Sequence, residues 1–320
     1  MDRNDLAGRD EQASADVRKL VQHVSSVFIG KDEVLRQAIL TLVAGGHALI
    51  EDVPGLGKTL LAKAIAKSIS ANFKRIQLTA DLLPSDITGV SVFSQERHEF
   101  LFRPGPIFTQ ILLADEINRA TPRTQSALLE AMEEHRVTVD GELRELAAPF
   151  FVMATQNPVE LEGTYALPFA QMDRFMVRLS IGYMERDAEL RMLQSQQQSD
   201  PLDSLGPLLT ADRLLEIHEA SRRVRVEPVL AGYLLDLVRK TRSMETLEYG
   251  ASPRAALDLQ SFAQAQALWA GRDYTLPDDI KAAARATLPH RLIIRRGSRS
   301  VTTHARTIIE SVLESIPVPL

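Results

Sequence analysis

The segment Glu51–Thr59, with the sequence EDVPGLGKT, restricts the fold of this 320-residue chain more than any other feature. It follows a short apolar run, Ala48–Ile50, that predicts a buried strand, and it opens a helical pattern over Thr59–Ile69. A strand that passes through a glycine-rich loop into a helix is the setting of a phosphate-binding loop. Gly55 and Gly57 would let the backbone turn its N–H groups inward around a phosphate.

Two side chains of this loop carry the expected chemistry. Lys58 can reach the β and γ phosphates of a nucleotide, and Thr59 can offer its hydroxyl to Mg²⁺. The usual pattern begins with glycine, whereas this chain has Asp52 there. A Gly-Lys-Thr run that occurs in a loop by chance is the alternative, and the strand before it and the helix after it argue against that. The loop therefore predicts ATP and Mg²⁺ as ligands.

A second polar site follows the apolar run Ile111–Ala114, which ends in Asp115 and Glu116. A carboxylate at the carboxyl end of a central strand can hold the Mg²⁺ shell, and the adjacent glutamate can polarise a water for attack on the γ-phosphate. Paired acids are often solvated surface charge. Their position directly after a buried strand favours an active site.

A third buried run, Phe150–Ala154, ends in Thr155, Gln156 and Asn157. These polar side chains are well placed to orient the attacking water, and Asn157 is the candidate for a catalytic role. The alternative is a strand-terminal turn made by the Asn-Pro pair.

The apolar runs alternate with helical segments, which predicts a three-layer α/β domain with a parallel sheet. Two weaker strand candidates are Arg75–Leu78 and Met176–Leu179. We expect a flexible tail over residues 1–13, the α/β domain over 14–183 and an all-α domain over 184–320. Two hairpins are expected inside the α/β domain, near residues 90–103 and 136–147, the second around an Asp-Gly turn.

Composition narrows the possible partners. A formal net charge of −5 and an aromatic content of 5% argue against nucleic acid as a partner. The chain has no cysteine, which excludes disulfides and thiolate sites. No stretch predicts a membrane span or signal peptide, so we expect a cytoplasmic protein. The seven histidines lack ligand spacing and are expected at the surface or partly packed.

Taken together and in this order, the motifs resemble the AAA+ ATPases and, within them, the MoxR family. The likeness covers roughly residues 14 to 320 and is carried by Glu51–Thr59, Leu112–Ala120 (LLADEINRA), Thr124–Glu134 (TQSALLEAMEE), Ala154–Pro158 (ATQNP), Met172–Phe175 and Ala251–Arg254. Aspartate in place of the first glycine, as at Asp52, is similar to what MoxR sequences usually have at this position. Phe169 departs from the family, which commonly has glutamate there.

The resemblance implies a residue-by-residue site for ATP. Asn157 matches the sensor asparagine, Arg174 the arginine finger that reaches a neighbouring subunit, and Arg254 the second sensor of the helical lid. The implied nucleotide-binding residues are Ile29, Gly30, Pro54, Gly55, Leu56, Gly57, Lys58, Thr59 and Leu60, with Thr59 and Asp115 at the metal. For Arg174 the alternative is an ion pair with Asp173 or another nearby acid, and Arg119 and Arg123 are lesser finger candidates. For Arg254 the alternative is an ordinary surface arginine.

The resemblance also implies a homo-oligomeric ring, expected to be a nucleotide-dependent hexamer, that remodels a partner protein. The partner is expected to carry a von Willebrand factor A domain or to need a metal or cofactor inserted. The two hairpins match elements that couple nucleotide state to a partner, and surface decoration is the alternative. Three other functions stay open: a nucleic-acid translocase or loader, a nucleotide-gated binding module without turnover, and a small-molecule kinase.

Overall fold

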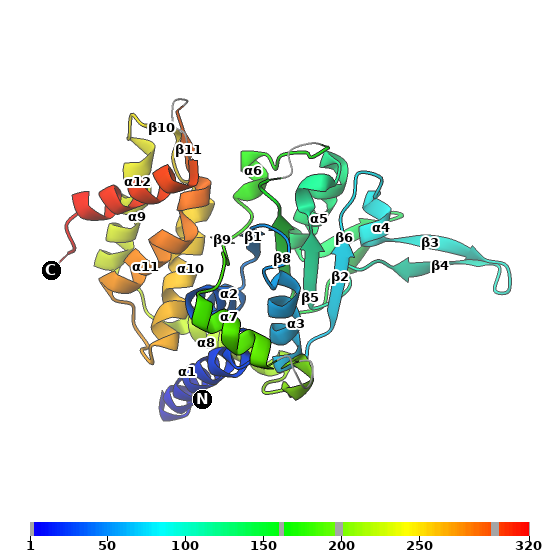
Figure 1. Ribbon diagram of the computed structural model, residues 1–320, viewed down its shortest axis with the longest axis horizontal. Helices are drawn as coiled ribbons and strands as arrows, with labels where there is room; N and C mark the ends of the chain where they lie inside the picture. The colour runs from blue at the N-terminus through cyan, green and yellow to red at the C-terminus, as the bar shows by residue number, and fades with distance from the viewer. Residues whose placement is uncertain (1–2, 160–162, 196–200, 296–300, 320) are drawn as a thin grey trace.

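The computed structural model describes residues 3–159, 163–195, 201–295 and 301–319. Its centre is a five-stranded parallel sheet with the strand order β2-β5-β8-β1-β9 (Figure 1). The strands are β1 (Ala48–Glu51), β2 (Phe73–Gln77), β5 (Ile111–Asp115), β8 (Phe151–Gln156) and β9 (Val177–Leu179). All five apolar runs identified in the sequence, including the two weaker ones, are strands of this one sheet.

Helices and short strands surround the sheet. Around it in the first part of the chain lie α1 (Arg3–Ser25), α2 (Asp32–Val43), α3 (Lys58–Ser68), α4 (Pro84–Thr88), η1 (Ile117–Arg119), α5 (Pro122–Glu134), α6 (Phe169–Met172), α7 (Arg186–Ser195) and η2 (Pro201–Ser204). The later part contains α8 (Ala211–Arg223), α9 (Pro228–Arg242), β10 (Leu247–Tyr249), α10 (Pro253–Trp269), α11 (Pro277–Thr287), η3 (Pro289–Arg291), β11 (Ile293–Ile294) and α12 (Val301–Ser315).

The sheet is covered on both faces because successive side chains of a strand point in opposite directions. Ala48 and Ile50 of β1 belong to a core shared with α1, α2, α3 and the later helices. Leu49, between them, packs into a second core together with Leu128 and Leu129 of α5. The predicted three-layer α/β architecture is thereby confirmed.

Two antiparallel hairpins interrupt the alternation of strands and helices. One is formed by β3 (Gly89–Ser94) and β4 (Glu99–Pro104), and it extends away from the sheet at the end opposite the later helices (Figure 1). The other is formed by β6 (Arg136–Val139) and β7 (Glu142–Glu145), with Asp140 and Gly141 at its turn. Each hairpin directly precedes a central strand, β5 or β8.

The later helices form a lid beside the sheet domain (Figure 1). The lid was expected to be all-helical, but Leu247–Tyr249 pairs antiparallel with Ile293–Ile294. None of the described helices is long and apolar enough to cross a membrane.

The N-terminal segment also differs from the expectation of a flexible tail over residues 1–13, because helix α1 begins at Arg3. Asp10 forms an ion pair with Arg223 of α8 at 2.5 Å, and Ala13 is buried. These contacts dock the part of α1 around Asp10 and Ala13, and the sequence pattern contained no signal for them.

Two histidines, His47 and His290, are fully buried rather than at the surface or partly packed as expected. The His47 ring bonds the carbonyl of Met132 through Nε2 and accepts from the N–H of Val152 at Nδ1, each at 3.1 Å. That pattern uses the neutral ring, and burial lowers the pKa of His47 from 6.5 to about 4. Burial also holds the pKa of His290 well below its ordinary value.

We therefore expect folding stability to fall as pH drops from about 6.5 to 4. In that window the unfolded state binds a proton at residue 47 and the native state does not, which favours unfolding by up to about 3 kcal/mol. Above pH 6.5 the stabilisation is fully present. Urea unfolding of wild type and His47→Asn at pH 7.5 and 5 measures this, with His98→Asn on an exposed turn as control. An equal pH dependence in wild type and His47→Asn would contradict it.

Candidate active site

The carboxyl ends of four parallel strands meet at one edge of the sheet. Their registers place Glu51 of β1 beside Gln156 of β8, and Gln77 of β2 beside Asp115 of β5. In α/β sheets this edge is where ligands bind. A pocket of about 320 Å³ opens there, lined by Pro54, Gly55, Gly57, Lys58, Thr59, Arg75, Gln77, Asp115, Glu116, Thr155 and Asn157.

The glycine-rich loop runs from β1 to the start of α3. Gly57 precedes the first turn of α3 in a left-handed conformation with φ of 84°, and Gly55 has φ of 87°. Glycine adopts these angles without the strain that a Cβ would bring. The N–H groups of the first turn of α3 and the Lys58 ammonium therefore form a site suited to an anion. Partial burial lowers the pKa of Lys58, while Asp52, Asp115 and Glu116 oppose that shift.

Asp52, the departure from the usual loop pattern, has a structural role in this chain. Its Oδ2 accepts hydrogen bonds from the N–H groups of Ile181 at 2.5 Å and Gly182 at 2.9 Å, and from the Ser180 hydroxyl at 3.2 Å. Its carbonyl accepts from Lys58 Nζ at 2.5 Å. Glycine could not make the first three contacts, so Asp52 ties the loop to the segment that follows β9.

Asp115 is buried and both of its carboxylate oxygens are engaged. Oδ1 accepts a hydrogen bond from the Thr155 hydroxyl at 2.8 Å. Oδ2 lies 2.7 Å from both Nε and Nη2 of Arg75, which reaches across from β2. The negative charge of Asp115 is therefore oriented by a hydroxyl on one side and balanced by a guanidinium on the other.

Glu116 stands at the turn that leaves β5. It has φ of 57°, a left-handed conformation that is uncommon for residues other than glycine and recurs at functional sites. Its N–H donates to the Thr155 hydroxyl at 2.9 Å, and its carboxylate lies 3.1 Å from Arg119. Asn157 follows the end of the neighbouring strand β8 and lines the same pocket. Glu116 and Asn157 can thus both reach a water in the pocket.

Comparison with known proteins agrees with this geometry. Residues 47–177 match the ATPase family associated with various cellular activities (AAA), and residues 239–312 match the AAA lid domain. The chain is 47% identical to the protein YeaC of Bacillus subtilis, over 94% of both chains. It is 36% identical to Chaperone MoxR1 of Mycobacterium tuberculosis, over 98% of this chain and 85% of that one. The chain belongs to the MoxR family of AAA+ ATPases. A crystal structure of a protein described as an ATPase from Cytophaga hutchinsonii, 36% identical, superimposes on this MoxR-family ATPase with a TM-score of 0.89 over 98% of both chains.

Several residues that the family resemblance assigned to nucleotide binding do not line the pocket. A Cβ placed on Gly57 would lie 3.5 Å from the Phe28 ring, so the segment that contains Ile29 and Gly30 lies beside the loop. Leu56 and Leu60 pack against the core instead. Of the nucleotide-binding residues expected in the glycine-rich loop and the start of α3, the pocket is lined by Pro54, Gly55, Gly57, Lys58 and Thr59.

Arg174 and Arg254 are not among the residues that line this pocket. Both form ion pairs with Glu133 near the end of α5, at 3.0 Å for Arg174 and 2.9 Å for Arg254. An intramolecular ion pair was the alternative for Arg174, and Glu133 is the acid that makes it. Phe169, the residue that departs from the MoxR pattern, begins the short helix α6 just before Asp173 and does not line the pocket.

Arg75 and Gln77 line the MoxR-family pocket but were not expected there from the sequence. Both lie on β2, which the sequence indicated only weakly, and their role depends on the pairing of β2 with β5. The only signal in the sequence was that Gln77 ends a weakly predicted strand, because the ends of parallel strands lie at the same edge of a sheet. Nothing in the spacing indicated that Arg75 pairs with Asp115.

Proposed function

We propose that this MoxR-family protein is a Mg²⁺-dependent ATPase that works as a ring of identical copies, a hexamer, and remodels partner proteins. The supporting observation is that two arginines to which the family resemblance gives catalytic roles are absent from the lining of the pocket. Arg174 and Arg254 do not line the pocket that contains Lys58. A second copy of the chain would bring such guanidiniums to the γ-phosphate, and a closed ring supplies every pocket in this way.

Thr59 and Asp115 are the residues that would hold Mg²⁺. Within the described part of the chain, no group of three or more His, Cys, Asp or Glu residues could hold a metal. A pocket with few protein ligands fits Mg²⁺, which usually takes one or two carboxylates together with phosphates and water. When bound there, Mg²⁺ neutralises phosphate charge during transfer. Arg75 keeps the Asp115 carboxylate aligned at this position.

Hydrolysis of ATP needs a base and an orienting group for the attacking water. Glu116 has the carboxylate for the first task, and its backbone is fixed by the bond to the Thr155 hydroxyl. Asn157, buried at the end of the neighbouring strand, suits the second. These assignments use the chemistry of pocket residues alone and do not depend on the assembly.

The two hairpins suit a role in partner contact. Phe93 and Phe100 are opposite each other on β3 and β4, with 48% and 72% of their surface exposed, and their rings contact edge to face. Exposed apolar groups on a projecting element are typical of protein contact. Arg144 of the second hairpin stacks on the Phe102 ring at 3.8 Å, so the two hairpins brace each other. β4 leads toward β5 and Asp115, which gives a path from partner to pocket.

The nature of the partner is argued from the relatives. MoxR1 is named a chaperone, and we propose the same general activity for this chain. Following the family resemblance, the proposed partner carries a von Willebrand factor A domain or needs a metal or cofactor inserted. The proposed place of action is the cytoplasm.

The test is the ATPase activity of the purified chain over a range of protein concentrations. We expect the activity per subunit to rise as copies assemble and then level off, and EDTA to abolish it. Single-stranded DNA is expected to change the ATPase activity by less than about twofold. Activity per subunit that is independent of concentration would contradict the ring, and strong stimulation by DNA would favour the translocase alternative.

A further inference from the structure

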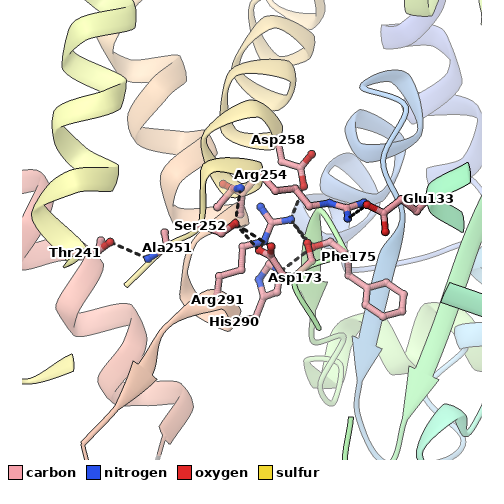
Figure 2. A network of polar contacts seen from close by, with 12 residues as sticks. Glu133, Asp173, Phe175, Thr241, Ala251, Ser252, Arg254, Asp258, His290 and Arg291 are labelled. Atoms are coloured by element: carbon pink, nitrogen blue, oxygen red, sulfur yellow. Dashed lines mark hydrogen bonds and ion pairs between the residues drawn. The ribbon is translucent and has the colours of Figure 1, made fainter. Parts of the chain in front are cut away.

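The carboxylate of Glu133 contacts two arginines at once, with one oxygen each. Oε2 lies 3.0 Å from Nε of Arg174, and Oε1 lies 2.9 Å from Nη1 of Arg254. The three residues come from separate parts of the fold: Glu133 from α5, Arg174 from the turn before β9, and Arg254 from the first turn of α10 in the lid. Figure 2 shows the Arg254 guanidinium reaching from the lid to Glu133.

The two guanidinium groups share the single carboxylate of Glu133 and are accessible. The buried Arg291 takes the two other carboxylates of the network, those of Asp173 and Asp258, which leaves Arg174 and Arg254 with Glu133. The side chains of Arg174, Arg254 and Glu133 are 27%, 33% and 41% exposed, so another molecule can reach them. A guanidinium has five N–H donors. The contact to Glu133 uses a small part of that capacity, and the rest can bind a further anion.

Glu133 also overcomes an electrostatic obstacle. The guanidiniums of Arg174 and Arg254 carry the same charge and repel each other. Arg254 also lies in the first turn of α10, where the helix dipole disfavours a cation. A carboxylate between the two guanidiniums removes both penalties. Without it, the two long side chains would separate into solvent.

The backbones that carry the two arginines are already fixed by a buried joint (Figure 2). Nη2 of Arg291, which is fully buried, donates to the carbonyls of Asp173 and Phe175 at 2.9 Å each, on either side of Arg174. The hydroxyl of Ser252, the N-cap of α10, donates to the Asp173 carboxylate at 2.8 Å. These contacts fix the position of the lid relative to the core. The positions of the two guanidinium groups depend on Glu133.

We propose that Glu133 is a positioning residue that holds Arg174 and Arg254 together as one two-guanidinium site for the terminal phosphates of ATP bound to a second copy of this chain. This inference rests on the proposed ring, because it assigns the occupant of the site to a neighbouring pocket. It adds an acid to the set of residues needed for turnover.

The first test compares Glu133→Gln with Glu134→Gln, a matched control on the same helix whose ion pair with Arg136 is exposed. A neutral amide cannot balance two guanidiniums. We expect Glu133→Gln to lower kcat at least about tenfold, because misplaced transition-state groups lose that much. KM and the affinity for a fluorescent ATP analogue should change by at most a few-fold, because Glu133 is outside the pocket and the guanidiniums act mainly on the charge that develops during phosphate transfer. Thermal unfolding should be unchanged for both variants, since exposed ion pairs add little stability.

The second test mixes Glu133→Gln subunits with Lys58→Ala subunits, and Arg174→Ala with Lys58→Ala serves as reference. Glu133→Gln keeps its pocket, and Lys58→Ala keeps its arginine pair, so an equimolar random ring should regain about one quarter of wild-type activity. If the reference pair recovers activity but Glu133→Gln alone is as active as Glu134→Gln, the role of Glu133 is refuted and the ring stands. If Glu133→Gln is impaired and not restored by mixing while the reference is, the residue acts within its own subunit and the inference fails. If the reference pair also shows no recovery, the proposed ring site itself is refuted.

Discussion

Replacing Lys58 with alanine is expected to weaken ATP binding by about 30- to 150-fold, since a lost charge-assisted contact to phosphate is worth about 2–3 kcal/mol. The Lys58 ammonium is half-buried at the start of α3, where the lowered pKa reflects its partial removal from water. Alanine removes the only lysine that lines the described pocket and leaves Arg75 committed to Asp115. Binding of a fluorescent ATP analogue, followed by titration, measures the loss.

Lys63→Ala provides the matched control for this experiment. Lys63 is on the same helix but is exposed and outside the pocket, so its removal changes net charge and helix composition equally. We expect Lys63→Ala to bind the analogue like wild type, and both variants to unfold at similar temperatures. Affinity of Lys58→Ala within a few-fold of wild type would remove the phosphate assignment, and with it the interpretation of the loop.

The sheet and the centre of the site could be predicted because they depend on local patterns. A short apolar run that ends in polar residues, such as Ile111–Asp115, indicates a buried strand and the edge where its last residue lies. The parallel order then brings the strand ends together without further information. Lys58, Thr59, Asp115, Glu116 and Asn157 all line one pocket for this reason.

Contacts between distant segments could not be predicted in the same way. The Asp52 carboxylate looked like a defect in a loop motif until its bonds to Ile181 and Gly182 were visible. Arg75 belongs to a strand with little apolar character, and only the β2–β5 register places it at Asp115. The Glu133 cluster depends on how the lid packs on the core. Sequence spacing contains no measure of these distances.

The distinction between local and distant contacts also explains the His47 result. The residue precedes β1 and looks polar in the sequence, but α5 and β8 supply both of its hydrogen-bond partners. A buried polar ring is stable only when such partners are present. Histidine burial was therefore decided by packing that no local pattern encodes.

Glu116→Gln is expected to bind ATP like wild type and to hydrolyse it at least about tenfold more slowly, since a positioned general base contributes about a hundredfold or more. Glutamine keeps the shape of the side chain and the N–H that donates to Thr155, so the left-handed turn at this residue is no more strained than before. The change removes only the negative charge that can polarise water. Steady-state turnover at saturating ATP, together with analogue binding, separates the two effects.

The control for this variant is Glu130→Gln, an exposed position on α5 outside the pocket. It should turn over ATP at the wild-type rate. Because Glu116 belongs to its own pocket and Glu133 to the arginine pair, the two variants should also differ on mixing with Lys58→Ala. Both Glu116→Gln and Lys58→Ala lose function within one pocket, so their mixture has no intact pocket and should gain no activity, whereas Glu133→Gln should recover. Unchanged turnover in Glu116→Gln would leave the hydrolytic base unassigned, and recovery of Glu116→Gln on mixing would place its action at a neighbouring pocket.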